Sequence, residues 1–478
     1  MFRLHFFRIF AMMLFFAASF LSSCSKTETP RVLPKPVREN TKEARLKELV
    51  YTNTYDMYLW QDQLPTSFPT EDYRRAEDVL EALTEYSRDP VTHVKLDRFS
   101  FLDRSGTVER EISEGRKGSF GFDVRYQNET DLYVKMVYPG SPAAEAGMER
   151  GFQVLAINGN SELANSLHEP NDYQFLFDAL DAESIELRLK KPDNTELSVT
   201  LQRKEFQIQP VFFSDIYTVG NKNVGYFVLE SFVSTKDDLG RDTELMNKLN
   251  EIFNLFQANQ VEEVIVDLRY NGGGAVITAE DLSNFLAPTS VSENALMYSY
   301  GINETLRKED EERDENDRFF SPVHFNKTNT LNPTRVYFLI TEGTASASEL
   351  LINNLKPYTD VKLIGEGVTY GKPVGFYAVS IMNNDLYAVS FKTINADGET
   401  DYYEGMPVDK DVTEDLRWNW GDVNDPLLRE ALHYAESGSF TSEMILRRSQ
   451  TDAATDKAGL NRKLDLRGNK DMYYFSLK

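Results

Sequence analysis

A serine and a lysine within the stretch 341–375 are the residues of this sequence best suited to do chemistry together. Ser346 lies in the small-residue segment GTASASE, which is typical of a sharp turn between a strand and a helix. Lys372 ends the segment TYGK, 26 positions later (372 minus 346). A serine hydroxyl is a poor nucleophile until a base removes its proton, and a lysine serves as that base only when burial lowers its pKa from about 10.4 to roughly 7 or 8. The pair therefore predicts a Ser/Lys dyad in a dry pocket.

The flanking residues predict the elements that bring this pair together. The apolar run VYFLI at 336–340 predicts a buried strand, and leucine and isoleucine at helical spacing over 350–355 predict a helix. Pro357 ends that helix. A second short strand is predicted at 361–364, ahead of the segment GVTYGK that leads to the lysine. This order of elements allows two side chains that are distant in sequence to meet in space.

Three consecutive glycines end the segment DLRYNGGG at 267–274. Backbone amides can face a substrate only where no side chain intrudes, so glycines after a buried strand suit the binding of a developing oxyanion. The alternative is a turn that only ends the strand.

The first 24 residues resemble a bacterial lipoprotein signal. Arg3 and Arg8 precede an apolar stretch of 12 residues, which is too short to span a bilayer, and the segment LSSC follows. Cys24 is the only cysteine of the chain, so it has no disulfide partner and we expect it to be lipidated. The alternative is a free thiol after an ordinary secretory signal. We expect a lipid-anchored protein in the envelope of a Gram-negative-type bacterium, on the outer membrane facing the periplasm.

Composition excludes some partners. The net charge of -24 argues against nucleic acid, because a phosphate-binding surface needs clustered lysine and arginine. No HExxH or paired-cysteine pattern indicates a metal, and we expect no cofactor. The chain has five histidines, none in a recognisable motif, so a Ser/His mechanism is the weaker alternative. They are His5, His93, His168, His324 and His433.

The segment PGSPAAEAGMERGFQVLAINGN at 139–160 resembles the PDZ domain of bacterial proteases. The resemblance implies that an upstream glycine-containing loop binds the terminal carboxylate of a peptide that adds a strand to the sheet. That loop comprises Gly118, Ser119, Phe120, Gly121 and Phe122. Two alternatives remain open: a PDZ module that only packs against the core, and one that binds an internal segment.

The PDZ-like segment, DLRYNGGG, and GTASASE with TYGK together resemble the carboxyl-terminal processing (tail-specific) serine peptidase family over about 117–437. The resemblance implies a crotonase-like α/β core and hydrolysis of proteins or peptides with exposed C-terminal tails. It implies that Ser346 is the nucleophile, Lys372 the general base, and the amides of Ala347 and Gly273 the oxyanion hole. Ser348 is the competing nucleophile, although its position matches a supporting hydroxyl.

This sequence departs from the family pattern in three places. The spacing from serine to lysine is one residue longer than usual, and Phe376 stands where many relatives carry a glutamine that orients the lysine. An acidic residue found midway in the helix of some relatives has no clear equivalent near Lys356 and Pro357. A loop absorbs the extra residue, but Phe376 favours a rival hypothesis, a peptide-binding lipoprotein whose dyad has decayed and which acts as an adaptor or scaffold.

The predicted fold class is multidomain α+β. A length of 478 residues is too great for one core, helical spacing marks the N-terminal part, short strands mark the next part, and strands alternate with helices after position 206. The charged segment 304–318 is expected to be an exposed loop. The predicted domains are a signal peptide (1–23), a tether (24–40), a helical N-terminal region (41–116), a PDZ-like domain (117–205), an α/β serine protease core (206–437) and a C-terminal tail (438–478).

Overall fold

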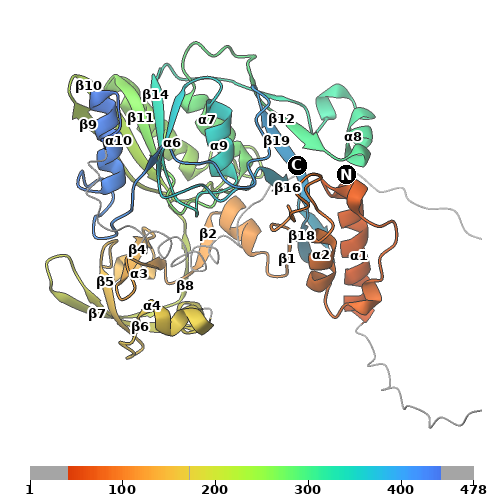
Figure 1. Ribbon diagram of the computed structural model, residues 1–478, viewed down its shortest axis with the longest axis horizontal. Coiled ribbons are helices and arrows are strands. Elements are labelled where there is room, and N and C mark those ends of the chain that lie inside the picture. Colours follow the sequence, from red (N-terminus) through yellow and green to blue (C-terminus); the bar gives the residue numbers. More distant parts are fainter. Residues whose placement is uncertain (1–40, 172, 443–478) are drawn as a thin grey trace, which may run out of the picture. The chain divides into compact units, whose positions relative to one another are not determined.

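The computed structural model describes residues 41–171 and 173–442 (Figure 1). The predicted signal peptide, the tether with Cys24 and most of the predicted tail lie outside the described residues. Among the described helices, none has the length and apolar character needed to cross a membrane.

The N-terminal region packs two helices against each other. Apolar side chains at helical spacing are buried in both, including Leu46 and Val50 in α1 and Val79 and Leu83 in α2. The chain then forms β1, which pairs antiparallel with β18 of the core. The bounds are α1 Thr41–Met57, α2 Ala76–Thr84, β1 Phe101–Asp103 and β18 Asn384–Tyr387.

The next region is a five-stranded antiparallel sheet in the order β3-β4-β5-β6-β7. Helix α5 packs on it through the buried Leu176 and Ala179. A separate ladder pairs β2 with β8 and joins the ends of this region. The bounds are β2 Arg116–Ser119, β3 Phe122–Tyr126, β4 Leu132–Val137, α3 Pro142–Glu145, β5 Gln153–Ile157, α4 Asn165–His168, α5 Gln174–Asp181, β6 Ser184–Lys190, β7 Glu196–Gln202 and β8 Lys204–Gln207.

The core is built on a six-stranded sheet in the order β20-β15-β14-β11-β10-β9. All neighbours are parallel except β9 and β10, which are antiparallel. The bounds are β9 Val211–Val219, β10 Lys222–Leu229, α6 Glu244–Ala258, β11 Val261–Asp267, α7 Val276–Leu286, β14 Arg335–Ile340, α9 Ala347–Leu355, β15 Asp360–Gly365, β20 Lys410–Asp411 and α10 Pro426–Ser437. The strands and helices predicted around Ser346 are confirmed.

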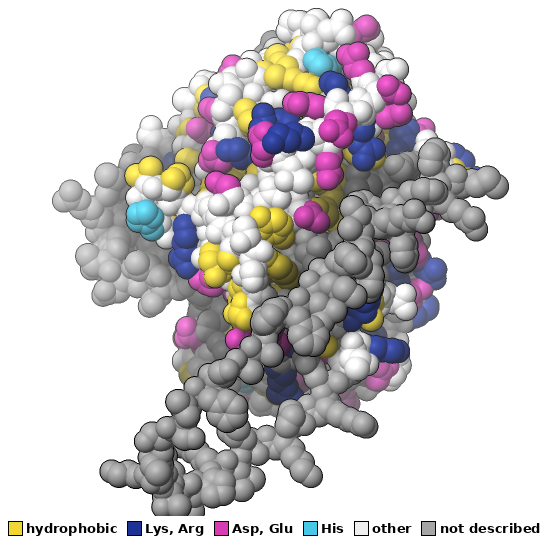
Figure 2. All heavy atoms as spheres, turned by 90° about the vertical axis from the view of Figure 1, so that its right-hand side faces the viewer, with side chains coloured by type: hydrophobic (Ala, Val, Ile, Leu, Met, Phe, Trp, Pro, Cys, Tyr) yellow, Lys and Arg dark blue, Asp and Glu magenta, His cyan; other side chains and the backbone are white. Residues whose placement is uncertain are grey.

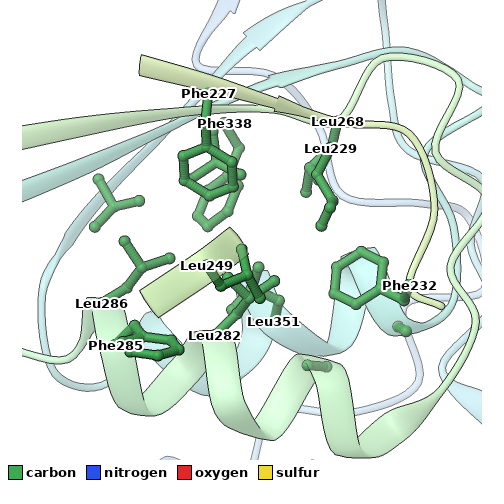
Figure 3. Close-up of a cluster of buried hydrophobic side chains, with 14 of the residues drawn as sticks. Phe227, Leu229, Phe232, Leu249, Leu268, Leu282, Phe285, Leu286, Phe338 and Leu351 are labelled. Carbon is green, nitrogen blue, oxygen red and sulfur yellow. The ribbon is translucent and has the colours of Figure 1, made fainter. Parts of the chain in front are cut away.

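Helices cover both faces of this sheet (Figure 1). Figure 3 shows one face, where side chains of α6, α7 and α9, such as Leu249, Leu282 and Leu351, pack against Phe227 and Phe338 of the strands. The other face packs against α10. Because both faces are buried, the central strands contain continuous apolar runs, such as residues 336–340 of β14, instead of alternating.

A second sheet flanks this core in the order β13-β12-β19-β16, and β18 also pairs with β17. The bounds are β12 Leu296–Ile302, β13 Val323–His324, β16 Val374–Phe376, β17 Val379–Ile381 and β19 Val389–Asn395. Strand β16 begins two residues after Lys372, so this sheet fixes the chain that leaves the lysine.

The prediction of an exposed loop at 304–318 was wrong for residues 304–311, which form a helix. Residues Glu304–Glu311 form helix α8, which begins at Asn303, whose side chain accepts the backbone N–H of Leu306 at 2.8 Å. The charged side chains remain mostly exposed, as a helix allows. Figure 2 shows the face on that side of the molecule, where acidic and basic side chains are interspersed.

Candidate active site

Three loops that follow neighbouring parallel strands converge at one edge of the large sheet. The glycine turn follows β11, Ser346 follows β14, and Lys372 follows β15. The carboxyl ends of parallel strands meet at one edge of a sheet, which is where α/β proteins build their sites. The order of the strands therefore brings together residues that lie about 100 positions apart (372 minus 273).

Ser346 occupies a strained turn between β14 and α9. Its φ is 56° and its ψ is -111°, a conformation that a residue with a side chain rarely adopts. Ser346 is half-buried, whereas the residues on both sides of it are buried. The turn thus presents the serine to solvent from an otherwise closed segment, as in a nucleophile elbow.

Glu349 joins the serine turn to the lysine loop. The backbone N–H groups of Ser346 and Lys372 both donate to its Oε2, at 2.9 and 2.8 Å. The two nitrogens therefore lie no farther apart than the sum of these distances. Its Oε1 accepts the N–H of Gly371 at 2.8 Å and the hydroxyl of Thr369. Burial raises the pKa of Glu349, and these hydrogen bonds oppose the rise.

The side chain of Lys372 is buried among aromatic rings. The residue is 1% exposed, and its Nζ lies 4.0 Å from the ring centre of Phe376 and 5.8 Å from that of Phe99. Burial holds the pKa of Lys372 well below its ordinary value, although the carboxylates of Asp97 and Glu349 act to raise it. Burial thus favours the neutral amine, the form of lysine that can act as a base.

Gly273 lies directly against the serine turn. A β-carbon added to it would stand 2.8 Å from the nitrogen of Ala347 and 2.9 Å from Cβ of Ser346, so only glycine fits. Its φ of +102° also favours glycine. The N–H of Gly273 donates to Oδ1 of Asn271 at 2.8 Å. An oxyanion at this position would have to replace that side-chain acceptor.

Ser348 has a different environment from Ser346. It is fully buried, and its hydroxyl donates to the backbone carbonyl of Asn271 at 3.0 Å. Nε2 of His168 forms a hydrogen bond with the backbone carbonyl of Glu162, and Nε2 of His433 forms one with the hydroxyl of Ser437. Within the described part of the chain, no group of histidine, cysteine and carboxylate side chains could hold a metal ion.

A cavity of about 570 Å³ lies beside β3 and α5. Four of the five predicted peptide-binding residues, Gly118, Ser119, Phe120 and Phe122, contribute to its wall. Gly121 does not, but a β-carbon there would stand 2.0 Å from Cβ of Ser141, which requires glycine. Apolar side chains of β3 and α5 form the rest of the wall together with charged residues, among them Val124, Phe177, Leu180, Lys117 and Lys135.

Three segments of the chain match known domains. Residues 223–413 match peptidase family S41, residues 45–101 match the peptidase S41 N-terminal domain, and residues 133–191 match the PDZ domain. The chain belongs to peptidase family S41. The members of this family are serine proteases, so the resemblance stated from the sequence motifs is confirmed.

The curated relatives of this S41 chain are distant. The carboxy-terminal processing protease CtpA of Bacillus subtilis is 22% identical over 338 residues, which are 70% of this chain and 64% of that protein. The carboxyl-terminal-processing protease of a Picosynechococcus species is 25% identical over 265 residues, which are 54% of this chain and 55% of that protein. The chain thus spans less than two thirds of the length of these relatives.

A solved structure shares the fold. A Bacteroides fragilis protein assigned to the S41 proteases is 24% identical and has a TM-score of 0.63, with 86% of this chain and 100% of that chain covered. This similarity concerns the fold alone. Together with the domain matches it confirms the predicted multidomain α+β class, with an N-terminal domain, a PDZ domain and an S41 core.

The PDZ domain meets the S41 core at a buried group of charges. Glu414 of the core forms ion pairs with Arg150 at 2.7 Å, Arg269 at 3.1 Å and Arg125 at 3.4 Å. Burial acts to raise the pKa of Glu414, but the three guanidinium groups outweigh it and bring the pKa to about 2. Arg125 and Arg150 belong to the PDZ domain, so this carboxylate joins the two domains.

Sequence reasoning missed two parts of the site. Glu349 was not singled out, although Ser346 and Glu349 have the spacing S-x-x-E of a capping box, which was the available signal. The contact of Phe99 with Lys372 spans 273 positions (372 minus 99), and no local sequence pattern predicts it.

Proposed function

We propose that this chain is a serine endopeptidase that cleaves proteins or peptides with exposed C-terminal tails, with Ser346 as the nucleophile and Lys372 as the general base. One observation carries the proposal: the backbone amides of both residues share a single oxygen of Glu349 while the lysine side chain is buried. The shared oxygen thereby places the backbone of the lysine loop beside the half-buried turn that carries the Ser346 hydroxyl.

The reaction follows from this arrangement. The amine of Lys372 takes the proton of the Ser346 hydroxyl as Oγ attacks the carbonyl carbon of the substrate. The resulting ammonium then gives that proton to the leaving amine, and an acyl-serine remains. Water attacks the ester with the same amine as its base, which releases the acid and restores the hydroxyl.

A dry pocket makes the lysine available. A fall in pKa of about 3 units corresponds to about 4 kcal/mol of destabilisation of the ammonium relative to the amine. The ring of Phe376, 4.0 Å from Nζ, supplies part of that apolar surrounding. Phe376 is therefore compatible with catalysis, although it replaces the glutamine of many relatives.

The oxyanion would be stabilised by the amides of Ala347 and Gly273, each of which contributes about 3 to 4 kcal/mol in well-studied cases. Gly273 stands against the serine turn, but its amide donates to Asn271. In this proposal the side chain of Asn271 turns away when substrate binds, and the amide then faces the developing charge.

The PDZ domain would capture the tail of the substrate. The cavity beside the loop from Gly118 to Phe122 has the size of a ligand site, and its mixed apolar and charged wall suits a terminal carboxylate with an apolar side chain. Cys24 would carry the lipid that holds the protein at the outer membrane, facing the periplasm. The expected partners are thus protein substrates and, through the anchor, a membrane.

The rival is an adaptor that binds tails without cutting them. The hydrogen bond between Gly273 and Asn271 favours it, because an occupied amide cannot stabilise an oxyanion. Digestion of fluorescein-labelled β-casein separates the two. We expect cleavage by the wild-type chain and by Lys356→Ala, an ion-paired lysine at the end of α9, and none by Ser346→Ala or Lys372→Ala. Tail binding without cleavage by the wild-type chain would support the adaptor.

A further inference from the structure

A segment of the S41 N-terminal domain reaches the catalytic lysine. Phe99 lies 5.8 Å from Nζ of Lys372, on a wall completed by Phe376. Phe101 stands edge-on to Phe376, with ring centres 5.9 Å apart and planes at 88°. The aromatic surrounding of the lysine is therefore made jointly by the N-terminal domain and the core.

Arg98 forms hydrogen bonds with the backbone of the loop that carries Lys372. Its Nη2 donates to the carbonyl of Tyr370 at 2.7 Å and to that of Tyr403 at 3.1 Å. Its guanidinium also lies 5.1 Å from the ring centre of Tyr370. Since Tyr370 and Gly371 directly precede Lys372, Arg98 restrains this stretch through its carbonyl groups, and Glu349 restrains the same stretch through the N–H groups of Gly371 and Lys372.

Asp97 fixes the turn that presents these two residues. It is fully buried and accepts the hydroxyl of Tyr58 at 2.6 Å and the backbone N–H groups of Phe99 and Ser100, both at 2.9 Å. These contacts lie within the N-terminal domain. Asp97 and Glu349 are the carboxylates whose charge acts on Lys372, from opposite elements of the site.

We infer that residues 97–101 are part of the catalytic site, with Phe99, Phe376 and Arg98 as the positioning residues of Lys372. The inference rests on the proposed role of Lys372 as the base. A ring face attracts an ammonium more weakly than an amide oxygen accepts its hydrogen bond, and it excludes water. This wall therefore orients the lysine while leaving its proton easy to lose.

Three variants test the inference: Arg98→Ala, Phe99→Leu and Phe376→Gln. Two changes in the same domain serve as controls. Arg104→Ala breaks ion pairs to Glu43 and Glu77, and Phe68→Leu removes a ring stacked on Tyr51 and Tyr73. In the described part of the chain, these partners of Arg104 and Phe68 all lie outside the lysine loop.

The readouts are kcat and KM for labelled β-casein between pH 5 and 10, and the rate at which a fluorophosphonate labels Ser346. We expect kcat to fall about tenfold in Arg98→Ala and Phe99→Leu with KM unchanged, the size of one desolvated cation–ring contact. In Phe376→Gln we expect the acid limb of kcat to move to higher pH, because an amide oxygen favours the ammonium. Both controls should match the wild type.

The inference is overturned if Arg98→Ala and Phe99→Leu keep the wild-type kcat, or if the controls lose as much. A fall in melting temperature could mimic the effect in Arg98→Ala. Arg98→Lys, which keeps a cation over Tyr370, should then give an intermediate kcat; a kcat equal to that of Arg98→Ala would also count against the inference. Full activity of Lys372→Ala would instead refute the proposed function.

Discussion

Two buried glutamates of this molecule have opposite chemistry. Glu349, at the candidate active site, accepts hydrogen bonds from a hydroxyl and three backbone amides, and burial raises its pKa. Glu414, between the PDZ domain and the core, faces three guanidinium groups, and its pKa falls to about 2. Both side chains are almost wholly removed from water.

The opposite pKa shifts of the two glutamates distinguish a carboxylate that holds two domains together from a carboxyl group at the candidate active site. Burial raises the pKa of a carboxyl group that is held by neutral dipoles, whereas neighbouring arginines lower the pKa of a carboxylate and stiffen the contact. Burial lowers the pKa of Lys372, although the charge of Glu349 acts to raise it. At the candidate active site the pKa values of a buried acid and a buried base are both shifted toward the neutral form, which is typical of functional sites.

The largest expected effect is on stability, at Glu414. Glu414→Gln removes the charge that three arginines share, so we expect the free energy of unfolding to fall by about 3 to 5 kcal/mol in urea titrations at pH 7. The matched control is Glu251→Gln, whose partner Lys248 lies 3.0 Å away on the surface. A change below about 0.5 kcal/mol is expected there. Equal losses in both variants would contradict the comparison.

Acid should remove the same contribution. The folded pKa of Glu414, about 2, lies below its ordinary value of 4.5, so its stabilising effect is complete above pH 4.5 and is lost as the pH falls toward 2. The difference corresponds to about 3 kcal/mol. Urea titrations between pH 7 and 2.5 should show this loss in the wild type and a smaller one in Glu414→Gln. Parallel pH profiles would refute the assignment.

Glu349→Gln should damage activity more than stability. An amide offers one oxygen, so its NH₂ group must face donors that the carboxylate accepted, and the serine turn and lysine loop separate. We expect β-casein cleavage to fall about a hundredfold, the scale of losing one well-placed hydrogen-bond donor. The loss of unfolding free energy should be smaller than in Glu414→Gln. Undiminished cleavage would show that Glu349 does not position the dyad.

Ser348→Ala should have the smallest effect. Its hydroxyl donates to the carbonyl of Asn271, which also accepts the backbone N–H of Ala345 at 3.0 Å, so its removal deletes one of two hydrogen bonds and lowers the unfolding free energy by about 1 kcal/mol. Cleavage should persist within about tenfold, because a lost hydrogen bond of this kind only loosens the glycine turn. If a folded Ser348→Ala variant did not cleave β-casein, that result would indicate that Ser348 is the nucleophile.

The sequence predicted most of the core because local pattern and fold agree there. The run at 336–340, the helix after Ser346 and the strand at 361–364 are apolar segments between turn residues, and they became β14, α9 and β15. Helix α8 was missed because its residues are charged, and the cap at Asn303 was not weighed. Charge indicates exposure, but it does not exclude a helix.

Parts of the site could not be predicted because they depend on how the backbone and side chains of its loops are oriented, which the sequence pattern does not show. From the sequence, Phe376 indicated an impaired active site, because a phenyl ring cannot replace the glutamine that orients the lysine in many relatives. In the structure its face stands 4.0 Å from Nζ of Lys372. The hydrogen bond from Gly273 to Asn271 likewise depends on the conformation of the glycine turn. Lipidation of Cys24 lies outside the described residues and stays a prediction.

The most direct test is the pH dependence of the reaction of Ser346 with a fluorophosphonate, followed by mass spectrometry of the labelled peptide. The account predicts one labelled residue, Ser346, with a rate that rises through a single pKa well below that of an ordinary lysine. In Lys372→Ala that dependence should vanish together with the fast labelling. Labelling at another residue, or an identical pH profile in Lys372→Ala, would contradict the account.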